Sequence, residues 1–297
     1  MVKRKICFKI GGIKFSLESQ NSLSKLENIH MLKRFIVGSM SRPDIRLVIK
    51  CRDVDKKFLS LNNSQKIFDG YYWGLHQAEN KKILLFSAPE IKYLPQPYHA
   101  AVFNKNFSYG EIFDRNRLGK TPEINPLLPL MGPILVSSLL YTKNAVLFHS
   151  CGVVDKGVGF IFLGHSGYGK TTTANLWIKS GAMLLNDDKV IIRKINKKFW
   201  IFGTPWFGKF RNVSPSGAPL KGIFFLKHGK ANKATRVSSS QAVSLLISRS
   251  HAPLWDNCAY QKSIDLCGQI VKNIPCYELE FVPDNTAVNF VRALAAK

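Results

Sequence analysis

Apolar and polar residues alternate over short runs in the first third of the chain, a pattern typical of β-strands. The runs with this pattern are residues 6–17, 45–51 and 81–88, with a weaker one at 98–103. Between them, only residues 21–35 have the spacing of a helix. We therefore expect residues 1–120 to form a β-rich N-terminal module without a catalytic group of its own, suited to substrate recognition.

The pattern changes after residues 114–126, a polar stretch with Gly and Pro that is typical of a linker. We expect strands at residues 145–154, 159–163, 183–186, 221–226 and 277–282, with a hairpin that starts at 190. We expect helices at 127–141, 170–180, 239–249, 258–273 and 284–296. Strands that alternate with helices predict an α/β domain over residues 121–297.

The charge of the chain favours anionic partners. Lys and Arg outnumber Asp and Glu by 43 to 19, a net charge of +24. Nucleotides, phosphates, acidic peptides, nucleic acid and anionic membranes are all candidates. The excess is divided evenly between residues 1–120 and 121–297, so no basic arm for nucleic acid is indicated. A Lys-biased composition that only maintains solubility explains the same excess.

Six cysteines are scattered along the chain without a CxxC pair, which argues against a structural zinc site. Cys258, Cys267 and Cys276 are nine residues apart, a spacing that alternates helix faces. We expect free thiols, as in a cytoplasmic protein.

The longest apolar stretch, residues 127–141, contains two prolines and is shorter than a membrane span. Near the N-terminus, Lys9, Gly11, Gly12 and Lys14 interrupt any apolar run, so we expect no signal peptide. We expect no membrane association and a cytoplasmic location.

Residues 164–171 read GHSGYGKT and fit the phosphate-binding pattern G-x-x-x-x-G-K-[ST]. The glycines let backbone N–H groups face phosphate oxygens, and the loop opens a helix whose N-terminus favours anions. We expect Lys170 to reach the outer phosphates and Thr171 to ligate Mg²⁺. The residues expected to bind ATP or another nucleoside triphosphate are Gly164, His165, Ser166, Gly167, Tyr168, Gly169, Lys170, Thr171 and Thr172.

Asp187 and Asp188 follow the next predicted strand, where a nucleotide site needs a carboxylate for its metal. Adjacent residues of a strand point to opposite sides unless the backbone turns there. If both carboxylates face one site, their mutual repulsion makes one of them a stronger proton acceptor, as a general base requires. A strand-end turn without a functional role is the alternative.

His149 precedes Gly164 by 15 residues, and the spacing from this histidine through the loop to the paired aspartates resembles the kinase domain of HPr kinase/phosphatase. The resemblance covers about residues 128–297 and implies a P-loop-containing core of the type also found in phosphoenolpyruvate carboxykinase. It further implies ATP and Mg²⁺ as cofactors, with His149 in the active site and Lys170 on the phosphates. By the same resemblance, Asp187, assisted by His149, deprotonates a serine hydroxyl, and Asp188 and Thr171 hold the metal.

The chain departs from HPr kinases at Thr172, where they have Glu, and it lacks their Arg-Gly-Leu-Gly signature. Residues 203–208 and 218–220 instead resemble shorter HPr-kinase-like proteins found beside ribosomally made peptides, including kinases of lasso-peptide precursors. The resemblance implies a serine-containing peptide or protein as substrate, and the basic charge fits an acidic one.

Residues 204–207 form a Pro-Trp loop bounded by glycines. Two interpretations fit it equally: a rigid aromatic surface for a peptide or base, or a tryptophan that plugs the core. Lys209 and Arg211 follow, and we take Arg211 as a candidate catalytic cation for the transferred phosphate. Arg249 and His251 are weaker candidates, because cations are common at helix C-termini.

The sequence thus predicts an ATP- and Mg²⁺-dependent serine kinase. A kinase for a small molecule such as free serine is the enzymatic alternative, and a non-catalytic, nucleotide-dependent binding or regulatory module is another. Nucleic-acid binding is a weaker alternative, and a homo-oligomer is compatible with the sequence.

Overall fold

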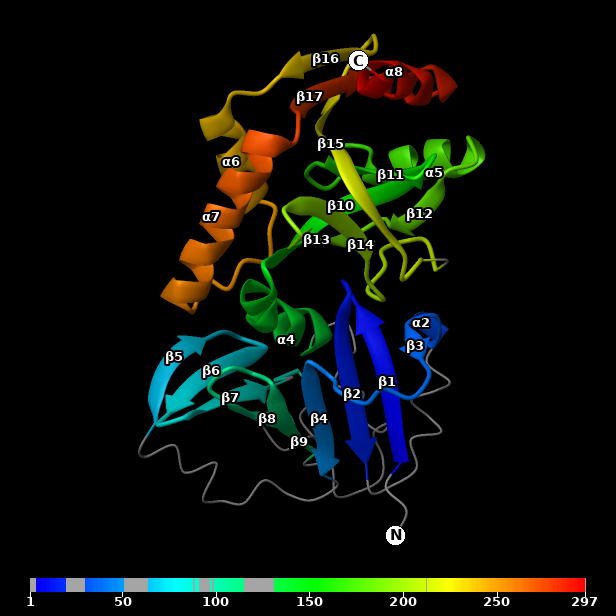
Figure 1. The fold of residues 1–297 in the computed structure, drawn as a ribbon. Coiled ribbons are helices and arrows are strands. Elements are labelled where there is room, and N and C mark those ends of the chain that lie inside the picture. The colour runs from blue at the N-terminus through cyan, green and yellow to red at the C-terminus, as the bar shows by residue number, and fades with distance from the viewer. Residues whose placement is uncertain are drawn as a thin grey trace. The chain divides into compact units, whose positions relative to one another are not determined.

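The computed structural model describes residues 4–19, 30–50, 64–87, 89–90, 97, 99–114, 131–211 and 213–296. They belong to a mixed α/β chain with two sheets (Figure 1). The chain divides into two compact units, the first made of Met1–Lys9 and Ile13–Leu139 and the second of Ile10–Gly12 and Leu140–Lys297. The expected linker lies outside the described residues from position 115 onward.

The described part of the first unit is built on one sheet with the strand order β3-β1-β2-β4-β9-β8-β7-β6-β5. Its elements are β1 (Arg4–Ile10), β2 (Ile13–Ser19), α2 (His30–Lys33), β3 (Ile36–Val37), β4 (Ile45–Lys50), β5 (Gln65–Asp69), β6 (Trp73–Ala78), β7 (Lys81–Phe86), β8 (His99–Asn104), β9 (Tyr109–Asp114) and α4 (Met131–Leu140).

The sequence predicted this unit only in part. The single strand expected at 6–17 is two strands, because Gly11 and Gly12 adopt φ values of 61° and 73° and turn the chain. Of the helix expected at 21–35, the described residues contain only the four residues of α2, since residues 20–29 lie outside them. Strands β5, β6 and β9 were not expected.

The second unit carries the candidate chemistry. Its elements are η2 (Tyr141–Lys143), β10 (Ala145–Asp155), β11 (Val158–Leu163), α5 (Lys170–Lys179), β12 (Met183–Asn186), β13 (Lys189–Ile195), β14 (Lys198–Gly203), β15 (Gly217–His228), β16 (Lys233–Arg236), α6 (Ser239–Ile247), α7 (Asn257–Asn273), β17 (Cys276–Phe281) and α8 (Asn285–Ala296).

Strand β10 has two sets of partners. Its first half pairs antiparallel with β13, and its second half pairs with β11 and β12. Strand β15 likewise pairs first with β14 and then runs parallel to both β11 and β17. The carboxyl ends of β11, β15 and β17 therefore meet at one edge of the sheet, and the loop after β11 opens there.

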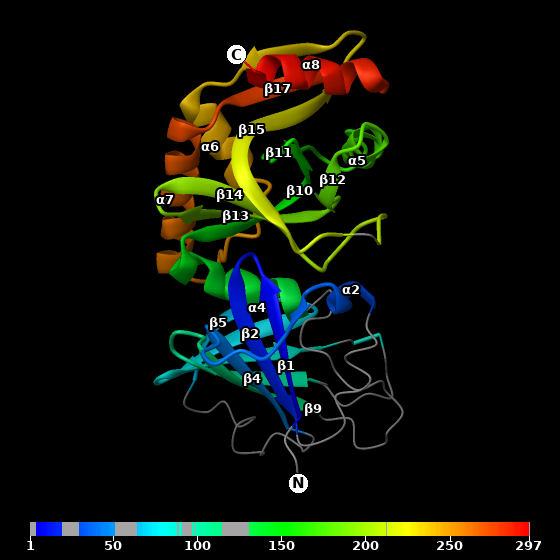
Figure 2. The ribbon, with the colours of Figure 1, turned by 45° about the vertical axis from the view of Figure 1, so that its right-hand side comes forward.

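Helices cover both faces of this sheet (Figure 2). Helices α6 and α7 bury Leu246, Leu266 and Ile270 in one core, and α5 and α8 bury Trp177 and Val291 in the other. The Trp177 ring lies 5.5 Å from that of Phe160 and 5.8 Å from that of Phe162, centroid to centroid. Each such buried aromatic side chain contributes about 1.5–3 kcal/mol, so α5 is firmly held against β11.

The predictions for this unit are largely confirmed. Helices α5, α6, α7 and α8 and strands β12 and β17 begin and end within two residues of the expected positions. The hairpin of β13 and β14 turns at Asn196 and Lys197, whose φ values of 47° and 67° are those of a tight hairpin turn.

Among the described helices, none has the length and apolar character needed to cross a membrane. The cysteines within the described residues are free thiols, namely Cys7, Cys151, Cys258, Cys267 and Cys276.

Candidate functional site

The loop between β11 and α5 is shaped by glycines. Gly167 and Gly169 adopt φ values of 87° and 91°, in the left-handed region that favours glycine. A Cβ atom on Gly169 would also lie 2.9 Å from the Phe281 ring. The chain therefore turns tightly around the loop and starts α5 at Lys170, which leaves the N–H groups of the helix N-terminus free for an anion.

The Lys170 side chain folds back over this loop. Its Nζ donates to the carbonyl oxygen of Gly164 at 2.7 Å and to that of His165 at 3.3 Å. Burial lowers the pKa of Lys170, and the nearby Asp188 carboxylate opposes this shift. An anion in the loop would relieve the desolvation of this ammonium group better than the two carbonyls do.

Asn186 turns the backbone at the end of β12. Its Oδ1 accepts the N–H groups of Asp188 at 2.7 Å and Lys189 at 2.9 Å, which is an Asx-type turn. Because of this turn, Asp187 and Asp188 do not point to opposite sides. Both line the same pocket, as they must if the two carboxylates act in one site.

Asp187 is 4% exposed and binds the backbone of a neighbouring loop. Its Oδ1 accepts from the N–H of Gly208 at 3.0 Å, and its Oδ2 accepts from those of Lys209 at 2.7 Å and Phe210 at 3.3 Å. Three of the four lone-pair positions of this carboxylate are thus used to hold residues 208–210.

His149 contacts Asp188, not Asp187. His149 of β10 is in register with Lys189 of β13, and its Nε2 lies 3.5 Å from Asp188 Oδ1. Lys189 Nζ forms an ion pair with the other oxygen, Oδ2. The sequence paired His149 with Asp187, whereas the register of β10 and β13 places the imidazole beside Asp188.

The surroundings of His149 favour its neutral form. Burial lowers the pKa of the His149 imidazole, Asp188 opposes the shift, and Lys170 and Lys189 add to it. Its side chain is 47% exposed, so it remains accessible from the pocket.

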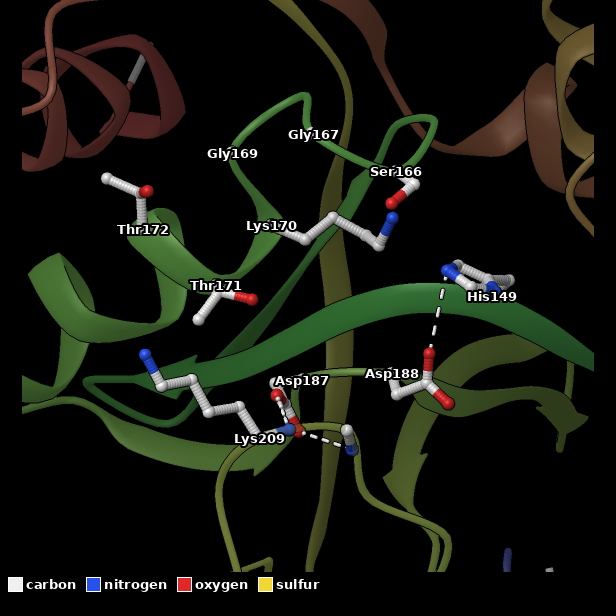
Figure 3. A pocket seen from close by; sticks show the side chains of 11 residues that line it. His149, Ser166, Gly167, Gly169, Lys170, Thr171, Thr172, Asp187, Asp188 and Lys209 are labelled. Atoms are coloured by element: carbon white, nitrogen blue, oxygen red, sulfur yellow. Dashed lines mark hydrogen bonds and ion pairs between the residues drawn. The ribbon is translucent and has the colours of Figure 1, made fainter.

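These groups line one pocket of about 360 Å³ (Figure 3). The lining residues are His149, Ser166, Gly167, Gly169, Lys170, Thr171, Thr172, Asp187, Asp188, Gly208 and Lys209. Nine of them are residues that the sequence predicted for the site, drawn together from β10, the loop, α5 and the turn after β12. Gly208 and Lys209 complete the wall.

Four other predicted site residues do not line the pocket. Gly164 accepts a hydrogen bond from Lys170, and His165 Nε2 lies 3.2 Å from Arg249 Nη2. Tyr168 packs against the His228 ring at 5.2 Å between centroids. Arg211 is exposed, and the structure does not bring it to the pocket.

The tryptophan of the Pro-Trp loop is packed in the core. Trp206 is 1% exposed and Thr204 is fully buried, so the interpretation of residues 204–207 as an aromatic docking surface is wrong at Trp206. Asn186 Nδ2 donates to the carbonyl oxygens of Thr204 at 2.8 Å and Trp206 at 3.1 Å, which fixes the loop to the turn.

Sequence reasoning missed Asn186. An Asn directly before a strand-end acidic pair is a typical turn residue, and this signal would have predicted the turn. Its bonds to Thr204 and Trp206 join positions 18 and 20 residues away, and no local pattern indicates them.

The pocket offers oxygen ligands of the kind that Mg²⁺ prefers, namely the Thr171 hydroxyl and the Asp187 and Asp188 carboxylates. Within the part of the chain that the structure describes, no three His, Cys, Asp or Glu side chains gather in a metal-binding group. The donor set fits a magnesium ion that is also bound by phosphate and water, as in many nucleotide sites.

No protein-family model matches the chain, and a comparison with curated proteins gives no match. Among solved structures, the chain is similar to the HPr(Ser) kinase/phosphatase from Coxiella burnetii, at 12% sequence identity and a TM-score of 0.29. The match covers 50% of this chain and 96% of that chain.

Proposed function

We propose that this chain is an ATP- and Mg²⁺-dependent kinase that phosphorylates a serine hydroxyl of a peptide or protein. One observation carries the proposal: a glycine-shaped loop with Lys170 shares a single pocket with the contacting pair of Asp188 and His149. Phosphoryl transfer needs both parts, one that binds phosphates and one that takes a proton.

The loop binds the phosphates. Its backbone N–H groups and the start of α5 meet the phosphate oxygens, and Lys170 exchanges its two carbonyl partners for them. Magnesium, when bound, neutralises phosphate charge. The Thr171 hydroxyl and a carboxylate of the aspartate pair would hold it.

Asp188 accepts the proton. The serine oxygen forms a bond to the γ-phosphorus, the bond to the bridging oxygen of ADP breaks, and the hydroxyl proton moves to the Asp188 carboxylate. This exchanges the two roles expected from the sequence. The Asp188 carboxylate contacts two side chains, His149 and Lys189, which can shift when it takes up a proton. The Asp187 carboxylate is fixed by three backbone N–H groups and serves better as a rigid metal ligand.

The acceptor we propose is an acidic, serine-containing peptide, such as a ribosomally made precursor of the lasso-peptide type. The net charge of +24 supports an acidic partner, since it raises the local concentration of anions. The sequence resemblance supports the peptide class. We assign acceptor recognition to the N-terminal unit.

A transfer assay separates the alternatives. The protein is incubated with Mg²⁺ and γ-labelled ATP, and the acceptors are an acidic serine peptide, the same peptide with alanine for serine, and free serine. Label on the serine peptide alone supports the proposal, and label on free serine alone replaces it by the small-molecule kinase. Nucleotide binding without label on any acceptor contradicts a kinase and favours the regulatory module.

A further inference from the structure

Residues 204–210, which follow β14, are held at both of their ends to the turn at residues 186–189 (the aspartate turn). Asn186 binds the carbonyl oxygens of Thr204 and Trp206, and Asp187 binds the N–H groups of Gly208, Lys209 and Phe210. Trp206, in between, is buried. Lys209 is therefore carried on a fixed segment, although its side chain is exposed.

Gly208 lets this segment pass directly against the carboxylates. A Cβ atom at this position would lie 3.0 Å from Asp187 Oδ2 and 3.2 Å from Asp188 Cβ. The backbone of Lys209 is thus placed by the same residues that form the pocket wall.

The three lysines of this region differ in their partners. Lys189 forms an ion pair with Asp188, and Lys170 is bound by two loop carbonyls. Lys209 lines the pocket, yet within the described residues its ammonium group has no carboxylate or carbonyl partner. In Figure 3 the ammonium groups of Lys170 and Lys209 lie on opposite sides of Thr171. An unpaired cation at this place is suited to an anion that enters the pocket.

We propose that Lys209 binds the γ-phosphoryl group of the triphosphate, opposite Lys170. The inference rests on the proposed function and deepens it. During transfer, negative charge is spread over the equatorial oxygens of the phosphoryl group, and cations on two sides neutralise it better than one. Lys209 then makes the pocket prefer a triphosphate over a diphosphate, and Asp187 acts as its positioning residue.

The test compares two nucleotides by calorimetry in the presence of Mg²⁺, using AMP-PNP as a non-transferable triphosphate and ADP. We expect Lys209→Met to weaken AMP-PNP binding about tenfold to hundredfold, as for the loss of a charge-assisted hydrogen bond. ADP affinity should change little, which also shows that the variant is folded. Lys209→Arg should retain most of the AMP-PNP affinity, and Lys198→Met, which removes an exposed charge from β14, should bind both nucleotides like the wild type.

Each other outcome overturns the assignment. If Lys209→Met lowers the affinities for AMP-PNP and ADP equally, Lys209 does not bind the γ-phosphate. If it binds both normally but has a raised KM for the peptide, Lys209 belongs to the acceptor site. In these cases the wild type still binds nucleotide and the proposed function stands. If the wild type binds neither nucleotide, the proposed function and this inference fail together.

Discussion

Asn186 and Thr204, 18 residues apart, are joined by two hydrogen bonds from one fully buried amide. Asn186 Nδ2 donates to the Thr204 carbonyl oxygen at 2.8 Å and lies 3.3 Å from its Oγ1. Thr204 Oγ1 in turn donates to the carbonyl oxygen of Lys189 at 2.8 Å. This closed set of bonds fixes the aspartate turn to the loop that carries Lys209.

The first prediction concerns stability. Asn186→Ala leaves the carbonyls of Thr204 and Trp206 and the N–H groups of Asp188 and Lys189 without their buried partner. Because each unsatisfied buried polar group costs about 1–3 kcal/mol, and relaxation recovers part of this, we expect a loss of roughly 3 kcal/mol in the free energy of unfolding.

Urea denaturation measures that loss, with Asn273→Ala as the control. The side chain of Asn273 is exposed at the end of α7, and its Nδ2 donates to the carbonyl oxygen of Gln269. Equal stability of the two variants would mean that the network around Asn186 does not hold the turn.

The second prediction concerns the close passage at Gly208. Gly208→Ala pushes its Cβ against Asp187, whose oxygens are already fixed by three backbone N–H groups. We expect the aspartate pair to shift by a few tenths of an ångström and phosphoryl transfer to fall about tenfold or more.

Gly268→Ala is the matched control, since a Cβ atom there meets nothing within 4 Å and α7 gains a better helix former. It should leave transfer unchanged. If Gly208→Ala transfers the phosphoryl group at the wild-type rate, the close passage of residue 208 to the carboxylates is not needed for activity.

The third prediction concerns the phosphate loop. Lys170→Ala removes the ammonium group that the loop carbonyls hold in place, and we expect both ATP binding and transfer to fall by at least about tenfold. Lys179→Ala removes a charge at the other end of α5 and should change neither. Unchanged ATP affinity in Lys170→Ala, measured by calorimetry, would exclude this loop as the nucleotide site.

Local patterns predicted the phosphate loop, α5 and the strand that delivers the aspartates, because residues 159–188 are adjacent in sequence and in space. The same reasoning paired His149 with Asp187 and did not predict its contact with Asp188, since the register of β10 with β13 and the Asn186 turn decide that contact. It also selected Arg211 over Lys209. The sequence of an irregular loop does not show which of its two cations, Lys209 or Arg211, lines the pocket. Here the bond from the Lys209 N–H to Asp187 places Lys209 there.

The fourth prediction concerns acid stability. Burial lowers the pKa of His251 from 6.5 to about 4, Lys189 and His149 add to the shift, and Asp188 opposes it. Its Nε2 is buried without a partner among the described residues. At neutral pH the imidazole is uncharged in both the folded and the unfolded state, so the shift has no effect on stability.

Below pH 6.5 the unfolded chain takes up a proton that the folded protein accepts only near pH 4, so the free energy of unfolding falls across this window. The loss attributable to His251 is of the order of 3 kcal/mol. His251→Phe should remove that part of the slope in denaturation curves recorded from pH 7 to pH 4. An unchanged slope would place the acid sensitivity elsewhere.

The measurement that tests the central claim most directly is the appearance of phosphoserine in an acidic serine peptide, read by mass spectrometry after incubation with ATP and Mg²⁺. The wild type should add one phosphoryl group, and Asp188→Asn should add none while it still binds ATP. Asp188→Asn removes the proton acceptor but keeps the shape of the side chain. A wild type that binds ATP but leaves every serine peptide unmodified, or an Asp188→Asn variant that phosphorylates the peptide at the wild-type rate, would contradict the account.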